Sequence, residues 1–243
     1  MARRSGERYV APTSPLVQMS TLDELIAGIR AIIPAQQARI QKDEKLWCVG
    51  DTSLVARKCV AIVGTRDVSL DGRARSRQLA RKLATAGVVV VSGLAKGVDT
   101  EALTAAIEAG GKVIAVIGTP IDRAYPSENK QLQERIYREH LLISQFAPGE
   151  RVYPSNFPER NKLMAAISDA TAIIEAGDTS GTLHQAAECV RLGRWLFIAR
   201  SVVSDPLLQW PKRFLGEPKV RTLNSVEDVL EALAAKNAEW QSR

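Results

Sequence analysis

The sequence has few of the residues on which metal and catalytic centres usually depend. Its 243 residues include two histidines and three cysteines. Cys48, Cys59 and Cys189 are far apart and lie among apolar residues, so we expect buried thiols in a reducing compartment and no disulfide. His140 ends a predicted helix and is expected to be solvated, while His184 stands alone. The sequence therefore predicts no metal site, no catalytic residue and no cofactor.

Long apolar runs are also missing. No run approaches the roughly 18 residues that a membrane-spanning helix requires. Arg3 and Arg4 are not followed by the apolar stretch that an export signal needs. We therefore expect a cytoplasmic protein without a membrane partner.

The common phosphate-binding signatures are absent as well. The sequence contains neither GxxxxGK[ST] nor GxGxxG, which excludes a P-loop and the usual dinucleotide fingerprint. Aromatic residues make up 5% of the chain, which is low for a protein that binds nucleic acid by stacking bases. The net charge of +6 nevertheless favours a polyanion as the partner.

Short apolar runs alternate with segments of helical length from Cys59 onward. The runs are rich in β-branched residues and apolar on both faces, as expected for strands of a parallel sheet covered by helices. The predicted strands are Cys59–Val63, Val88–Val91, Val113–Ile117, Leu141–Ser144, Ala170–Glu175 and Trp195–Ile198. The predicted helices are 70–86, 99–109, 128–139, 158–168 and 181–192. This pattern predicts an α/β fold with a doubly wound parallel sheet.

The two ends of the chain differ from this pattern. The first 19 residues are polar, and Thr21-Leu22-Asp23-Glu24 resembles a capping box that opens an amphipathic helix. After Arg200 a proline-containing stretch leads to a short strand and to a helix opened by Ser225. We expect one domain: a tail and helix over 1–45, the core over 46–200, and a loop with an edge helix over 201–243.

Glycines follow several of the predicted strands together with hydroxyls and cations. Ligands of an open parallel sheet bind beyond the carboxyl ends of its strands, where glycine lets backbone N–H groups approach an anion. Such turns also occur for structural reasons alone, but three on one edge favour a phosphate site. The candidate residues are Gly64, Thr65, Arg66, Ser92, Gly93, Lys96, Gly97, Ser180, Gly181 and Thr182.

The segment Phe157–Met164 provides two further cations. Arg160 and Lys162 flank Asn161 at the start of a predicted helix. A solvated helix face is one interpretation of this pattern. Since the segment precedes the fifth strand, we expect it to lie near the same edge of the sheet and to contact the same ligand.

These motifs resemble, in order and spacing, those of the DNA-processing protein A family (DprA, also called Smf). The resemblance covers about residues 46–198 and includes the lead-in strand Leu46–Asp51. The motifs that carry it are Gly64-Thr65-Arg66, Ser92 to Asp99, Tyr125-Pro126-x-x-Asn129, Phe157-Pro158-x-Arg160-Asn161 and Ser180-Gly181-Thr182.

The resemblance implies an extended Rossmann-like fold and binding of single-stranded DNA. It also implies that the protein loads the RecA recombinase onto DNA, as in natural transformation, and that it is a homodimer. By the same resemblance, Arg66, Lys96, Arg160 and Lys162 would form a basic pocket for the phosphates of the DNA.

Two other functions remain open. The wider superfamily includes the LOG-like nucleotide phosphoribohydrolases, whose motifs the segments Arg160–Met164 and Gly181–Gln185 resemble loosely. Gln185 occupies the position of the catalytic glutamate in those enzymes, and an amide cannot act as a base. A nucleotide sensor that uses the same loops is a related possibility. The other function is that of a structural or partner-binding module, which would show no affinity for anions.

Overall fold

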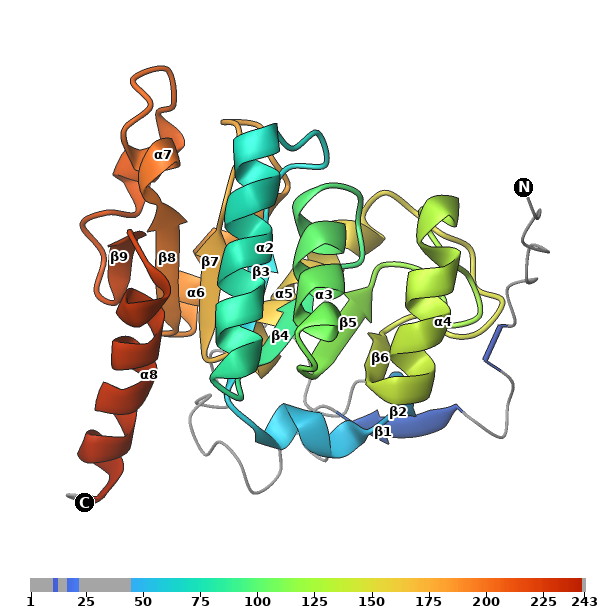
Figure 1. Cartoon of the computed structure of the whole chain (residues 1–243). Helices are drawn as coiled ribbons and strands as arrows, with labels where there is room; N and C mark the ends of the chain where they lie inside the picture. Colours follow the sequence, from blue (N-terminus) through green and yellow to red (C-terminus); the bar gives the residue numbers. More distant parts are fainter. Residues whose placement is uncertain (1–10, 13–16, 22–44, 242–243) are drawn as a thin grey trace, which may run out of the picture.

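A nine-stranded sheet forms the centre of the protein in the computed structural model, which describes residues 11–12, 17–21 and 45–241 (Figure 1). The strand order is β1-β2-β6-β5-β4-β3-β7-β8-β9, and only β1 and β2 are antiparallel to their neighbours. The strands are β1 Gln18–Thr21, β2 Lys45–Gly50, β3 Cys59–Val63, β4 Val89–Ser92, β5 Val113–Ile117, β6 Leu141–Ser144, β7 Ala170–Ile173, β8 Trp195–Ala199 and β9 Val220–Leu223.

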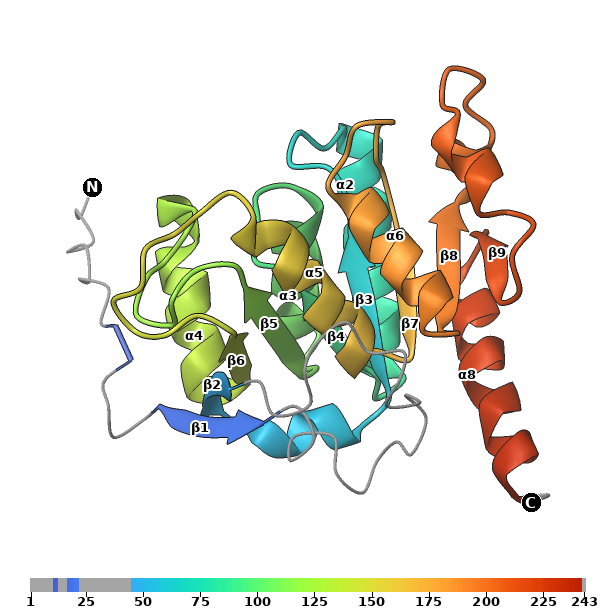
Figure 2. The ribbon, with the colours of Figure 1, turned by 180° about the vertical axis from the view of Figure 1, so that it is seen from behind.

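Helices cover both faces of this sheet (Figures 1 and 2). Helices α2, α3, α4 and α8 contribute to the hydrophobic core on one face, and α5 and α6 to that on the other. Strands buried between two helix layers must be apolar on both sides, which explains their continuous apolar runs. The helices described are α2 Leu70–Thr85, α3 Val98–Glu108, α4 Lys130–Glu139, α5 Asn156–Ile167, α6 Thr182–Arg191, α7 Arg200–Val203 and α8 Val226–Gln241, with 3-10 turns η1 Thr52–Ala56, η2 Ser127–Asn129 and η3 Trp210–Arg213.

The predicted doubly wound α/β fold is confirmed, with two corrections at the level of elements. The sheet is mixed, because β2 adds antiparallel to β6 and β1 to β2. Thr21, which the capping-box pattern places at the start of a helix, ends strand β1, so the predicted polar tail also includes a strand. The rest of that predicted helix lies outside the described residues. Of the helices among the described residues, none is long and apolar enough to cross a membrane.

His140 is a further correction. It follows α4, as predicted, but it is buried instead of solvated. Burial lowers the pKa of its imidazole to about 4. The helical pattern located the residue correctly, but its burial depends on a segment remote in the sequence: Gly50, at the end of β2, and Asp51, which follows it, pack against the backbone of His140.

The order of the parallel strands reverses between β3 and β7. From β3 the chain proceeds through β4 and β5 to β6 on one side, then returns to place β7 beside β3 and continues to β8 and β9. The loops that follow β3 and β7 therefore diverge to opposite faces. Such a topological switch point leaves a crevice at the carboxyl ends of the strands.

Candidate functional site

A cavity of about 440 Å³ lies at this switch point. It is formed by the loops after β3 and β7 together with the first turns of α3, α5 and α6. Eight of the predicted site residues line it, namely Gly64, Thr65, Arg66, Arg160, Asn161, Ser180, Gly181 and Thr182. Val63, Ala95, Asp99, Phe157, Pro158, Met164, Gly177, Thr179 and Gln185 complete the lining.

The turn after β3 is held tightly by its neighbours. A side chain on Gly64 would approach the Glu175 carbonyl oxygen to 2.8 Å and collide with Val98, so only glycine fits there. The Thr65 N–H donates to the Glu175 carbonyl at 2.7 Å, and the Thr65 carbonyl accepts from the Val98 N–H at 3.2 Å. These contacts fix the backbone from which Arg66 projects.

Arg66 is the exposed cation of the cavity. Its guanidinium carbon lies 5.4 Å from the centre of the Phe157 ring, a cation–π geometry that orients the side chain. Within the described part of the chain, no carboxylate forms an ion pair with it. Its charge is therefore available to an anionic ligand.

Arg160 occupies a different environment, although it lines the same cavity. It is 5% exposed, and its Nη1 donates to the Gly93 and Val116 carbonyls, the latter at 2.6 Å, while its Nε donates to Asn161 Oδ1 at 3.0 Å. Burial lowers the pKa of this guanidinium to about 10, against the raising effect of Asp99. Arg160 thus joins β5 to the loop after β4 and adds positive potential from below the surface.

Asp99 is the only acidic residue among those that line the cavity. Its Oδ2 accepts from the Gly93 N–H at 3.1 Å and from the Ala95 N–H at 3.4 Å. Burial raises the pKa of its carboxyl, while the charge of Arg160 and the two N–H groups oppose that rise. Asp99 therefore holds the loop after β4 in place, and its negative charge partly balances the positive charge of Arg160.

The loop after β7 contributes hydroxyl and N–H groups. Ser180 Oγ accepts from the Thr182 N–H at 3.2 Å and donates to Thr182 Oγ1 at 3.0 Å, while Asn161 Nδ2 donates to the Gly181 carbonyl at 3.2 Å. The Gly181 and Arg66 N–H groups have no hydrogen-bond partner among the described residues. Unpaired backbone donors near a cation form a suitable environment for a phosphate.

The other predicted residues lie outside this cavity. Ser92 is buried and its Oγ donates to the Ile62 carbonyl at 2.6 Å, so its hydroxyl is used within the sheet. Lys162 Nζ pairs with Glu159 at 2.6 Å, one turn before it on α5. Gly97 has a φ of 78° and opens α3, where a side chain would collide with the backbone of Thr65.

Lys96 and Gly93 line a smaller adjacent cavity of about 50 Å³. Arg66, Phe157 and Arg160 border both cavities, so the two hollows adjoin. Lys96 Nζ lies 2.6 Å from Glu128, with both side chains more than half exposed. Such an exposed pair has little net stability and can exchange its carboxylate for a ligand phosphate.

The sequence motifs contained two important residues whose roles could not be assigned from them. Asp99 and Phe157 stand within the motifs, but a carboxylate near a phosphate site and an aromatic residue before a helix carry no distinctive spacing. Asp99 accepts a hydrogen bond from Gly93 in the preceding loop, and the ring of Phe157 lies beside Arg66, which is remote from it in the sequence. His184 is exposed and does not line the cavity.

The comparisons with known proteins agree with this architecture. Residues 30–234 match the family model described as DNA recombination-mediator protein A. The DNA processing protein DprA of Streptococcus pneumoniae is 36% identical over 185 residues, which cover 76% of this chain and 65% of that protein. DprA of Bacillus subtilis is 30% identical over 196 residues, covering 80% and 66%. The chain thus spans about two thirds of the length of these curated relatives.

Solved structures show the same relationship. The structure of DprA from Streptococcus pneumoniae has a TM-score of 0.74 at 32% identity, and the matched region covers 88% of this chain and 73% of the DprA chain. A DprA structure from Helicobacter pylori has a TM-score of 0.74 at 27% identity, covering 90% and 97%. A molybdenum cofactor binding protein from Rippkaea orientalis shares only the Rossmann-like fold, with a TM-score of 0.55 at 17% identity over 74% of this chain and 96% of that one. The extent of the family match and these similarities show that the chain belongs to the DNA recombination-mediator protein A (DprA) family.

Proposed function

We propose that this protein binds single-stranded DNA through its phosphates in the cavity at the β3–β7 switch point. The observation that carries this proposal is the position of Arg66: an exposed cation without an acidic partner among the described residues, above a buried second cation. The free N–H groups of Arg66 and Gly181 add neutral donors beside it. Since all of these groups recognise phosphates and none reads a base edge, binding should depend on salt and little on sequence.

A relative supports the choice of ligand. The structure from Helicobacter pylori, which covers 90% of this chain, concerns the single-stranded DNA binding mode of that DprA. The adjoining hollow beside Lys96 and the half-exposed ring of Tyr125 would let the strand continue from one phosphate site to the next. We therefore propose Gly93, Lys96 and Gly97 as part of the same surface, with Gly97 shaping its backbone.

Hydrolysis of a nucleotide in the cavity is the weaker alternative. Gln185 is fully buried, and its amide hydrogen-bonds to Thr171 Oγ1 at 3.2 Å. Glu188, one helical turn further on, is also buried and is paired with Arg191, whose Nε donates to it at 2.8 Å. Neither side chain provides a free carboxylate to the cavity, so we propose a non-catalytic DNA-binding protein.

The decisive experiment compares Arg66→Gln with wild type in binding a fluorescent oligothymidine at several salt concentrations. We expect the affinity to fall about tenfold and the slope of log K against log salt to decrease by about 0.7, the value for one phosphate contact on a single strand. Arg57→Gln is the matched control. It also removes one arginine charge, but Arg57 precedes β3 and so lies at the amino end of that strand, away from the cavity. Equal affinities and slopes for Arg66→Gln and wild type would refute the proposal.

We further propose that the protein acts in the cytoplasm as a homodimer and passes the bound strand to the RecA recombinase. Support comes from the recombination-mediator description of the family model. A protein that holds phosphates leaves the bases free for a recombinase to receive. Addition of the protein to RecA and DNA coated with single-strand binding protein should increase the DNA-dependent ATPase activity of RecA, and Arg66→Gln should reduce the increase. No stimulation by the wild-type protein would contradict this role.

A further inference from the structure

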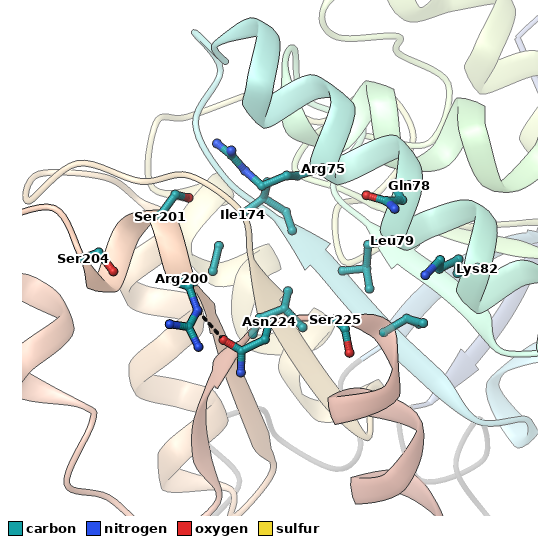
Figure 3. A pocket seen from close by; sticks show the side chains of 13 residues that line it. Arg75, Gln78, Leu79, Lys82, Ile174, Arg200, Ser201, Ser204, Asn224 and Ser225 are labelled. Atoms are coloured by element: carbon teal, nitrogen blue, oxygen red, sulfur yellow. Dashed lines mark hydrogen bonds between the residues drawn. The ribbon is translucent and has the colours of Figure 1, made fainter.

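A second, larger cavity of about 520 Å³ lies on the face of the sheet that α2 and α8 cover. It is bounded by α2, the carboxyl ends of β7, β8 and β9, the short helix α7 and the start of α8. Figure 3 shows side chains of α2, including Arg75 and Lys82, facing Arg200, Asn224 and Ser225 across it. The two cavities share no lining residue.

The charge of this cavity is positive. Arg75, Lys82 and Arg200 line it, and no aspartate or glutamate does. Of these three, Lys82 is the least available, because it lies near the exposed Glu227: a hydrogen bond from Ser225 mainly lowers the pKa of that carboxyl, and the charge of Lys82 lowers it further. Arg75 and Arg200 therefore carry most of the unbalanced charge.

Arg75 has an unusual lack of partners. Within the described part of the chain its guanidinium makes no hydrogen bond and no ion pair, and its Nε is buried without an acceptor. The neighbouring arginines of the same helix are paired: Arg77 with Glu101 and Glu108, and Arg81 with Glu108. Its two Nη groups also have no partner among the described residues but are not buried, so they remain available to a ligand.

Arg200 is oriented from the opposite wall. Its Nε donates to Asn224 Oδ1 at 2.7 Å, the bond drawn in Figure 3, which leaves the two Nη groups for another acceptor. The N–H groups of Asn224 and Ser225 at the start of α8 are already bound by Asp228 Oδ2, at 2.7 and 3.0 Å. An anion here would thus be held by arginine side chains, with their planar forks, and not by the helix terminus.

The rest of the cavity suits an organic group attached to the anion. Leu79, Ile174, Leu223 and Val226 supply apolar surface, and the hydroxyls of Ser201 and Ser204 lie at the rim beside α7. A volume of about 520 Å³ lies within the usual range for small-molecule sites, roughly 300–1,000 Å³. An apolar surface beside two arginines that form no ion pair with any described residue matches a base or sugar joined to a phosphate.

We propose that this cavity is a second binding site, which takes a nucleotide phosphate between Arg75 and Arg200. The phosphate belongs either to a free nucleoside monophosphate or to a nucleotide of a DNA strand. The proposal does not depend on the function assigned to the first cavity, because no residue is common to both.

The test uses adenosine monophosphate and a short single-stranded oligonucleotide as separate probes, with binding followed by calorimetry. Arg75→Gln and Arg200→Gln should each weaken the binding of at least one probe about tenfold. Arg81→Gln, which removes a paired charge from the same helix outside the cavity, is the matched control and should bind as wild type does. Thermal unfolding of each variant verifies that it is folded.

The pattern of losses identifies the source of the phosphate. Weaker binding of the monophosphate alone indicates a free nucleotide, and weaker binding of the oligonucleotide indicates a strand that extends to this face. The proposal is overturned if both cavity variants bind both probes like wild type. It is also overturned if monophosphate binding is lost in Arg66→Gln but kept in Arg75→Gln and Arg200→Gln, since the first cavity would then be the site.

Discussion

Replacement of Arg160 by methionine tests whether this residue supports the site from inside the protein. Methionine retains much of the apolar volume but removes the charge and every donor. The substitution leaves the Gly93 and Val116 carbonyls without their side-chain donor, and the buried Asp99 carboxylate without the positive charge that opposes the rise of its pKa. We expect a large loss of stability, in contrast to the exposed Arg66.

The magnitude follows from burial. Arg160 and Asp99 form no direct hydrogen bond, but each charge stabilises the other inside the protein. Removal of one of two such buried charges costs about 3–5 kcal/mol, because the other charge remains in an environment of low polarity. For a domain of this size, each kcal/mol lowers the melting temperature by about 2–4 °C, so a loss near 4 kcal/mol corresponds to roughly 8–16 °C. Arg160→Lys keeps the charge but loses the fork that reaches two carbonyls, and should cost about half as much.

A double variant separates the charge from the hydrogen bonds. Asp99→Asn removes the carboxylate charge and keeps an oxygen that can accept from the Gly93 and Ala95 N–H groups. Combined with Arg160→Met, it should recover about 0.5–3 kcal/mol relative to Arg160→Met alone, the usual size of coupling between neighbouring residues. The hydrogen-bond donors to the two carbonyls remain lost in both variants.

The assay is urea unfolding at neutral pH, followed by circular dichroism, with wild type, the three variants and Arg66→Gln measured together. We expect Arg66→Gln to unfold like wild type, because the side chain is exposed and has no partner to lose beyond the Phe157 ring. A loss below about 1 kcal/mol in Arg160→Met would refute the reasoning, since that is typical of an ordinary point mutation and not of a broken buried pair.

Two further predictions concern pH and backbone conformation. Burial lowers the pKa of His140 to about 4, so as the pH decreases from 6.5 the unfolded state binds a proton before the folded state does. The free energy of unfolding is therefore highest above pH 6.5 and falls as the pH decreases toward 4. His140→Leu should reduce this decline by up to about 3 kcal/mol in urea unfolding measured between pH 4.5 and 7.5, and an unchanged decline would contradict the assignment. Gly97→Ala should cost about 2 kcal/mol or more and weaken oligonucleotide binding, because its φ of 78° is combined with a collision against Thr65. Gly87→Ala has a similar φ of 76° with open space around it, so it should cost only about 1 kcal/mol and leave binding intact. Equal effects of the two alanine substitutions would show that the packing of Gly97 is unimportant.

Most elements of the fold are encoded locally. The strands β3, β5 and β6 have the predicted bounds, because a strand between two helix layers is apolar on both faces and its apolar run marks it in the sequence. Helix α2 begins where Ser69 caps it by accepting from the Gly72 N–H, a signal within four residues. The strand Gln18–Thr21 departs from the capping-box prediction because that pattern is short, whereas the strand depends on pairing with β2.

The environment of the site residues could not be predicted in the same way. Arg66 and Arg160 are equivalent in the sequence, each a cation in a loop or at a helix start, yet one is exposed and the other buried. The difference arises from Asp99, Gly93 and Val116, which approach Arg160 only when β4 and β5 lie side by side. Residues remote in the sequence decide burial and pairing, so the local pattern contains no information on them.

The sequence by itself determined that this chain is a doubly wound α/β protein and predicted an anion-binding edge, because strand and helix periodicity and glycine turns are local properties. The order of its motifs also indicates the family, because order and spacing are properties of the chain alone. Only the tertiary structure decided which cations are free to bind. Lys162 is paired with Glu159, whereas Arg75 and Arg200, far apart in the sequence, face one cavity from α2 and α7. That second cavity has no motif, because it exists only where β7, β8 and β9 meet α2.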